Sequence, residues 1–286
     1  MPADVRHISD TAKWVAAYRA LETERRQPIF RDPYASRLAG ETGRRLAREM
    51  PGGNGNAWSL IARTKVLDDL VERLIREARV DRVVNLAAGF DTRPYRLELP
   101  AGLRWIEVDL PPVLDEKAAL LADASPRCAL ERLPCDLSDR AARQAVFARA
   151  GAEGRVLVIT EGLLIYLEPA QVAELARDLA AVPTFQLWAM DVVNHRILRV
   201  LRRQWGKELV AGNSEMKFGP EERLKFFEPH GWHELWSVSL LTEAVRLGRP
   251  PLFGRLINLA LKLPMPTAQR QDLPWGGVAL LGRAGE

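Results

Sequence analysis

Five short runs of β-branched and apolar residues alternate with helical stretches in the middle of this 286-residue chain. The runs cover residues 82–86, 105–109, 129–135, 156–160 and 184–190. The fourth (VLVIT) is almost wholly apolar, which is typical of a strand buried on both faces of a parallel sheet. Helical patterns at 112–122, 139–149 and 168–181 separate the runs. This alternation predicts an α/β fold with a doubly wound, mostly parallel sheet.

The two ends of the chain differ from this middle part. Residues 1–56 read as helices joined by loops, and the stretch ends in the clearest linker of the chain, PGGNGN. We therefore expect 1–56 to form an N-terminal helical extension or cap and 57–286 to form the main domain. Runs at 233–238 and 278–281 predict two further strands.

Two segments near the predicted last strands are candidates for a substrate cover. They span residues 192–232 and 240–270. The part from 240 to 266 is rich in Leu and Arg, and a packed helix pair beside the last strands is the alternative interpretation.

Composition narrows the classes of partner. The net charge is only +4 and the arginines are scattered, which does not favour nucleic-acid binding. No apolar run approaches the roughly 20 residues needed to span a bilayer, and residues 1–10 lack the apolar core of a signal peptide, so we expect a cytoplasmic protein. Cys128 and Cys135 fit no zinc spacing, and we expect buried thiols and no metal site.

The first two predicted strands end in residues suited to a nucleotide. The stretch NLAAGFDTR at 85–93 places Gly89 just after the first strand, where a ligand can approach the backbone closely. Asp109 ends the second strand roughly 20 residues later, a position from which a carboxylate accepts hydrogen bonds from ribose hydroxyls. Glu107 shares its face, but Asp109 lies nearer the rim of the sheet. Both NAD enzymes and methyltransferases use this arrangement.

The third and fourth strands also end in acids. Asp136 could accept from an adenine amino group while Leu137 covers the ring; alternatively, Asp136 only helps to start the next helix. Glu161 follows the most apolar strand and lies near the middle of the rim. Tyr166, five residues later, is a candidate for contact with a substrate, with core packing as the alternative.

Together these segments resemble the leucine carboxyl methyltransferase-like family, especially its bacterial branch of natural-product (polyketide) O-methyltransferases. The resembling stretches are NLAAGFDTRPYRL at 85–97, WIEVDLPPVLDEK at 105–117, Asp136-Leu137 and EGLLIYL at 161–167. Upstream, Arg19–Glu22 with Asp32-Pro33-Tyr34-Ala35, and Ala62-Arg63-Thr64 with Asp68, extend the resemblance over about residues 10–190.

The resemblance implies a class I (Rossmann-like) methyltransferase fold, a seven-stranded sheet whose last strand is antiparallel, and S-adenosylmethionine as cofactor. The implied cofactor-binding residues are Arg19, Arg63, Ala88, Gly89, Asp109, Leu110, Asp136, Leu137 and Glu161. Arg63, with Arg19 as a second cation, would pair with the methionine carboxylate, and Glu161 would lie at the amino end. Asp109 would hold the ribose, and Asp136 with Leu137 would hold adenine.

One position departs from the family pattern. The family often has Gly-Ala-Gly where this chain has Ala87-Ala88-Gly89, so we expect Ala88 to stand where a glycine is usual. Its methyl group would crowd the cofactor if φ were positive there. We nevertheless expect binding to survive, because Gly89 and every strand-end acid are present.

We expect the acceptor to be a small molecule. We expect the protein itself to be a monomer or a homodimer. A phenol or alcohol acceptor requires a base, and His195, shortly after the fifth strand, is the candidate; a packing role is the alternative. A carboxylate is already ionised and needs no base, and no other base is evident near the rim, which favours a carboxylate acceptor. Tyr166 and His195 are therefore the candidate catalytic residues.

Three rival functions remain open from the sequence. A nucleotide-dependent oxidoreductase would share the sheet and the ribose acid, but the chain lacks G-x-G-x-x-G. The resemblance also leaves a protein carboxyl methyltransferase open, because the family's eukaryotic branch methylates a protein carboxyl terminus. A binding protein that kept the cofactor site without turnover is the third.

Overall fold

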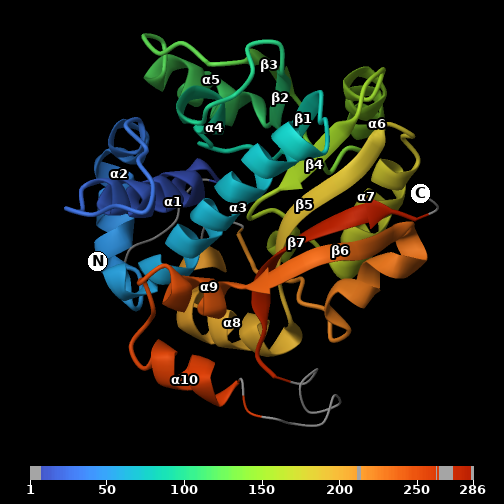
Figure 1. Ribbon diagram of the computed structural model, residues 1–286. Helices are drawn as coiled ribbons and strands as arrows, with labels where there is room; N and C mark the ends of the chain where they lie inside the picture. The colour runs from blue at the N-terminus through green and yellow to red at the C-terminus, as the bar shows by residue number, and fades with distance from the viewer. Residues whose placement is uncertain (1–7, 211–213, 262, 264–272, 285–286) are drawn as a thin grey trace.

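A seven-stranded sheet runs through the molecule in the computed structural model, which describes residues 8–210, 214–261, 263 and 273–284 (Figure 1). Its strands are β1 (Arg82–Leu86), β2 (Arg104–Asp109), β3 (Ala129–Pro134), β4 (Val156–Thr160), β5 (Phe185–Val193), β6 (Trp232–Ser239) and β7 (Gly276–Arg283). They lie in the order β3-β2-β1-β4-β5-β7-β6. Strands β1 to β5 are parallel, and β7 is antiparallel to both of its neighbours. The predicted α/β class, with the last strand antiparallel, is confirmed.

The register brings the carboxyl ends of the central strands to one edge. Leu86 at the end of β1 pairs with Val108 of β2 on one side and with Thr160 of β4 on the other. The chain leaves β1 in one direction along the sheet and later returns to the other, so a topological switch point lies between β1 and β4. Ligands of open α/β sheets bind at this point, which places the site before any side chain is considered.

Helices cover both faces of the sheet because its strands are apolar on both faces. On one face, α3 (Ala57–Glu77) packs Leu67 and Leu74 against Val83 and its neighbours. On the other, α6 (Arg140–Ala150) and α7 (Pro169–Ala180) pack Phe147 and Leu175 against a second buried cluster. The short helices α4 (Arg93–Arg96) and α5 (Pro111–Leu120) follow β1 and β2.

A third cluster closes the carboxyl edge of the sheet. It joins α1 (Ile8–Thr23) and α2 (Ala35–Glu49), at the left of Figure 1, to α8 (His195–Val210). Trp14 of α1 meets Trp205 of α8 edge-on, with ring centroids 5.1 Å apart. The small helices α9 (Leu240–Arg246) and α10 (Gly254–Ala260) complete this end of the molecule, and α9 packs on α3. No helix in the described ranges is long and apolar enough to cross a bilayer.

Three short 3-10 helices lie in the connections, at Gly53–Asn56, Leu164–Tyr166 and Arg223–His230. Most predicted element boundaries agree with the structure to within one or two residues. Strand β5, however, runs three residues beyond the expected end at Met190, and this extension carries Asp191 to the rim of the sheet.

Candidate active site

A cavity of about 840 Å³ opens at the carboxyl ends of the parallel strands. The elements around it are α1, α3, α8 and the loops that follow β1, β2, β3, β4 and β5. Among the residues that line it are Arg19, Arg63, Ala88, Gly89, Asp109, Leu110, Asp136, Leu137, Glu161 and Tyr166. The fold therefore brings together every site residue expected from the sequence except His195.

His195 is the first residue of α8 and does not line the cavity. The extension of β5 carries the chain past the rim before the helix begins. Successive helical residues turn roughly 100° around the axis, so His195 lies on the far side of α8 from Ile197 and Val200, which do line the cavity. The candidate base predicted from the sequence is therefore not positioned for that role.

The turn after β1 has a left-handed backbone at two positions. Ala87 has φ of 53° and Gly89 has φ of 48°, whereas Ala88 is not in this region. The sequence prediction assigned the missing glycine to Ala88, and the structure corrects this: Ala87 is the alanine in the strained conformation. A non-glycine residue there costs about 1–2 kcal/mol, a strain that is found preferentially at functional sites.

Asp109 ties this turn to the end of β2. The Gly89 N–H donates to one carboxylate oxygen at 2.6 Å, and the Leu110 N–H donates to the other at 2.7 Å. Burial raises the pKa of Asp109 despite these two bonds. The side chain is fixed by backbone donors, and its carboxylate keeps lone pairs for a ligand in the cavity.

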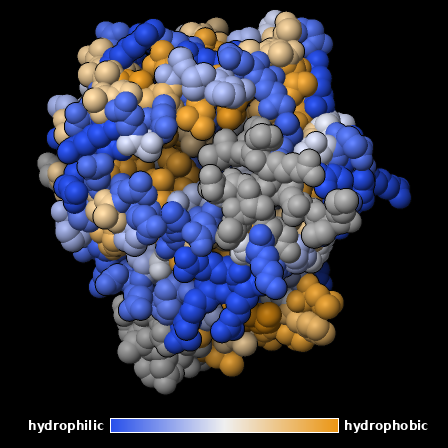
Figure 2. Space-filling model, turned by 180° about the vertical axis from the view of Figure 1, so that it is seen from behind, coloured by the Kyte–Doolittle hydropathy of each residue, from blue (hydrophilic) through white to orange (hydrophobic). Residues whose placement is uncertain are grey.

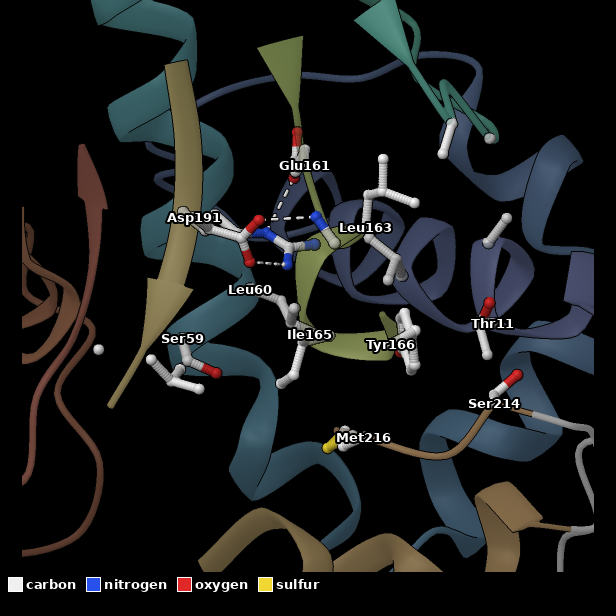
Figure 3. Close-up of a pocket in the computed structure, with 18 of the residues that line it drawn as sticks. Thr11, Ser59, Leu60, Glu161, Leu163, Ile165, Tyr166, Asp191, Ser214 and Met216 are labelled. Atoms are coloured by element: carbon white, nitrogen blue, oxygen red, sulfur yellow. Dashed lines mark hydrogen bonds and ion pairs between the residues drawn. The ribbon is translucent and has the colours of Figure 1, made fainter. Parts of the chain in front are cut away.

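Arg63 of α3 reaches the middle of the cavity and pairs with acids from two strand ends. Its Nη1 donates to Asp191 Oδ2 at 2.8 Å, and its Nε lies 2.9 Å from Glu161 Oε1. Figure 3 shows Glu161 and Asp191 converging there from neighbouring strands, and the Gly162 N–H donates to the second Asp191 oxygen at 2.6 Å. The sequence reasoning missed Asp191, which lies in β5 directly after the last residue that pairs with β4.

A second arginine beneath the site joins further acids. Arg93, 2% exposed, contacts Asp68 at 2.8 Å, Asp91 at 3.0 Å and Glu161 at 2.8 Å. Burial alone would raise the pKa of Asp91, but the charges of Arg93, Lys117 and Arg96, with the Arg93 N–H, together outweigh it and hold that pKa at about 2. Burial likewise opposes ionisation of Glu161, and Arg93 and Arg63 together keep its pKa below the usual value. Asp91 and Glu161 are thus held as carboxylates.

Arg19 fastens α1 over the turn. Its Nε donates to Asp32 at 2.8 Å and its Nη2 donates to the Phe90 carbonyl at 2.6 Å. Thr92 donates to the same Asp32 oxygen at 2.6 Å. Arg19 borders the cavity, but the structure gives these two groups as its partners and so ties α1, the following loop and the turn after β1 together.

Polar side chains also organise the far end of the cavity, after β3. Asp136 Oδ1 accepts from the backbone N–H and the hydroxyl of Ser138, which lowers the pKa of Asp136. Asp139 caps the helix that follows, because its side chain accepts from two N–H groups of α6. Arg143 donates to the Leu137 carbonyl at 2.7 Å. The Asp136-Leu137 pair is therefore held in place from both sides.

Comparison with known proteins agrees with this geometry. Residues 12–180 match the model of the leucine carboxyl methyltransferase family. A protein from Frankia alni, named provisionally as an S-adenosyl-L-methionine-dependent methyltransferase, is 38% identical over 257 residues, 85% of this chain and 88% of that protein. One from Streptomyces coelicolor with the same kind of name is 32% identical, covering 84% and 88%.

Two solved structures show the same fold. A DUF574 family protein from Streptomyces avermitilis superposes with a TM-score of 0.59 at 14% identity, covering 94% of this chain and 96% of that one. A protein from Thermobifida fusca, described provisionally as a methyltransferase, gives 0.55 at 18% identity, covering 98% and 96%.

Fold and family together define an S-adenosylmethionine-dependent methyltransferase with a class I sheet. The chain belongs to the leucine carboxyl methyltransferase family.

A substitution at the turn tests how closely the cofactor approaches its backbone. Gly89→Ala places a methyl group at a φ of 48° and 3.4 Å from the Ala12 side chain. We expect S-adenosylhomocysteine to bind about tenfold more weakly, because alanine costs about 1–2 kcal/mol in the left-handed backbone conformation that this turn has at the binding site. Gly206→Ala in α8, where nothing lies within 4 Å of the added carbon, is the matched control. Calorimetry giving equal Kd values for both variants would refute a close approach at Gly89.

Proposed function

We propose that the enzyme methylates a carboxylate oxygen of a small, natural-product-like acceptor. The observation that carries the proposal is the lack of a usable base. No histidine and no lysine occurs among the described residues that line the cavity. A hydroxyl acceptor would require such a group within hydrogen-bond reach, whereas a carboxylate acceptor is already nucleophilic at neutral pH.

The carboxylates of the cavity are all engaged. Arg93 holds Asp91 and Glu161, and Arg63 with the Gly162 N–H holds Asp191. The others pair elsewhere: Asp109 with backbone donors, Asp136 with Ser138, and Glu174 with Arg143. Burial raises the pKa of the Cys135 thiol, which keeps that group protonated. None of these groups is available to remove a proton from an acceptor.

The same residues suit the charges of the cofactor. Arg63 would pair with its carboxylate, and Glu161, with Asp191 beside it, would face its cationic amino and sulfonium groups. Asp109 would accept from the ribose hydroxyls, while Asp136 and Leu137 would hold the adenine ring. When bound, S-adenosylmethionine supplies a methyl group whose bond to sulfur breaks as the bond to the acceptor oxygen forms. The chain's contribution is to bind, align and exclude water.

Tyr166 is placed to orient the acceptor. Its side chain lines the same cavity as Arg63 and Asp191, and the charges of both residues act on its hydroxyl group. Burial raises its pKa to about 12, so the phenol stays protonated and serves as a hydrogen-bond donor rather than a base. We assign it the role of donating to the carboxylate oxygen that is not methylated. The described residues of 192–232 and 240–270 would form the substrate cover above it, and those of 1–56 a cap over the cofactor. Residues 1–7, 211–213, 262 and 264–270 of these segments lie outside the described part of the chain.

The pH profile tests the proposal. A carboxylate acceptor with a pKa of about 4 is fully ionised above about pH 6. We therefore expect kcat/KM to stay constant, within about twofold, from about pH 6 to pH 9, and His195→Ala to leave it unchanged. A rate that climbs about tenfold per pH unit would indicate deprotonation of a hydroxyl. A collapse of activity in His195→Ala would likewise contradict the account.

A further inference from the structure

The charged and the uncharged parts of the cavity lining come from different parts of the sequence. Its charged lining residues all lie between Arg19 and Asp191. From Val193 to Gly276, every described residue that lines it is uncharged, and most are apolar. The first group coincides with the part of the chain that the family model matches, extended by Asp191. The second group lies outside the part that the family model matches.

The apolar half has a definite set of walls, which we call the apolar arm. It consists of Ile197, Val200 and Leu201 from α8, Leu240 and Leu241 from α9, and Ile257 from α10. Two of these side chains remain open to solvent, since Val200 is 52% exposed and Ile257 is 48% exposed. Leu201 and Leu240 also pack against neighbouring buried clusters. Exposed apolar side chains that line a cavity mark a binding surface for an apolar ligand.

Strand β5 connects the arm to the reaction centre. Asp191, paired with Arg63, and Val193 both line the cavity, and residues two apart on a strand point to the same face about 7 Å apart. The next lining residue, Ile197, begins the arm and is the third residue of α8. A molecule lying along this path passes within a few carbon atoms from charged surroundings to uncharged, mostly apolar ones.

The mouth of the arm is apolar as well. Leu252, Phe253 and Leu256 lie beside Ile257 on and before α10 and are 83%, 66% and 66% exposed. The hydrophobic colour at the lower right of Figure 2 covers this helix. A ligand whose hydrocarbon chain is too long for the arm would thus meet further apolar surface rather than a polar rim.

We propose that the acceptor is an amphipathic carboxylic acid, with its carboxylate at Tyr166 and a long, uncharged apolar chain in the arm. This inference rests on the proposed function and adds the class of substrate. A second charged or strongly polar group on the chain would lose its hydration in the arm without gaining a partner there. Each buried methylene, in contrast, contributes about 0.8 kcal/mol, which is about fourfold in affinity.

Binding and turnover of straight-chain acids test this class of substrate. The series from butanoate to hexadecanoate is titrated by calorimetry into the protein saturated with S-adenosylhomocysteine, and methyl transfer is measured on the same acids. We expect Kd to fall and kcat/KM to rise about fourfold per methylene until the arm is filled. A Kd that is independent of chain length, or tighter binding of short dicarboxylates, would overturn the proposal.

Two substitutions on α10 sharpen the test. Ile257→Asn places an amide in the arm, whereas Leu259→Asn, on the same helix and 64% exposed, alters a side chain that does not line the cavity. Ile257→Asn should weaken binding of the longer acids at least tenfold and leave the Kd of butanoate unchanged. Leu259→Asn should change the Kd of neither. Equal effects of the two variants would contradict the assignment. Chain-length-dependent binding without transfer to any acid would refute carboxylate methylation but leave the apolar arm standing.

Discussion

Arg63→Ala is expected to weaken S-adenosylhomocysteine binding about a hundredfold or more. The substitution removes the cation proposed to pair with the ligand carboxylate. It also leaves Glu161 and Asp191, now without their shared partner, facing that carboxylate. A charge-assisted hydrogen bond contributes about 1.5–3 kcal/mol, and the added repulsion increases the loss. Calorimetry at fixed ionic strength measures the effect.

A second ligand separates recognition of the carboxylate from general damage to the site. 5′-Methylthioadenosine keeps the adenosine and the sulfur but lacks the amino-acid part. Arg63→Ala should barely alter its Kd, whereas Asp109→Ala should weaken both ligands, because Asp109 faces the ribose and orders the Gly89 turn. Arg73→Ala, on the same helix but outside the cavity lining, is the matched control. Equal weakening of the two ligands by Arg63→Ala would mean that Arg63 only holds the site together.

Among the substitutions proposed for this protein, Arg93→Met should cause the largest loss in the free energy of unfolding, about 3–5 kcal/mol at about pH 7. The buried guanidinium contacts Asp68, Asp91 and Glu161, and its removal leaves buried carboxylates short of positive charge. Arg76→Met, on the surface of α3 with its side chain 71% exposed, should change stability by less than about 0.5 kcal/mol. Urea unfolding of both variants measures the difference.

The loss in Arg93→Met should shrink as the pH falls. In the wild-type protein the pKa of Asp91 is about 2, below its unfolded value of about 4. Its contribution to stability is therefore full above about pH 4 and is lost as the pH falls towards 2. Without Arg93 the pKa of Asp91 is lowered less, so the variant has less of this stability to lose as the pH falls, and the difference between the two proteins narrows. A stability difference equal at about pH 7 and about pH 3 would contradict this electrostatic role.

The strands could be predicted because their signals are local. The run at 156–160 is apolar on both faces and matches β4, and 82–86 matches β1. The end of β5 was missed because Asp191 interrupts an apolar run and reads as a terminator. In the structure its charge is satisfied by Arg63 and the Gly162 N–H, so the strand continues to Val193.

The strand-end acids could also be predicted, because a parallel sheet gathers its carboxyl ends at one edge. The hydrogen-bond and ion-pair partners of the site residues could not be predicted. Arg63 and Asp191 are 128 positions apart, and Thr92 and Asp32 are 60 apart, so no local pattern connects them. The direction of the His195 side chain could not be predicted for a related reason. It depends on the residue at which β5 ends and on the residue at which α8 begins.

The apolar arm was beyond the reach of sequence reasoning as well. Its walls come from α8, α9 and α10, which are separated along the chain and show no common motif. The segment from 240 to 266 was expected either to pack as helices or to cover a pocket. In the described part of that segment both occur, since α9 packs on α3 while Leu240 and Leu241 line the cavity.

The chemical fate of a labelled methyl group tests the central claim most directly. The protein is incubated with methyl-labelled S-adenosylmethionine and a long-chain carboxylic acid, and the product is treated with mild base. Transfer to a carboxylate predicts that the label is released as volatile methanol, because a methyl ester hydrolyses under these conditions. Label that stays in a base-stable product would show transfer to a hydroxyl, nitrogen or carbon atom and would contradict the account.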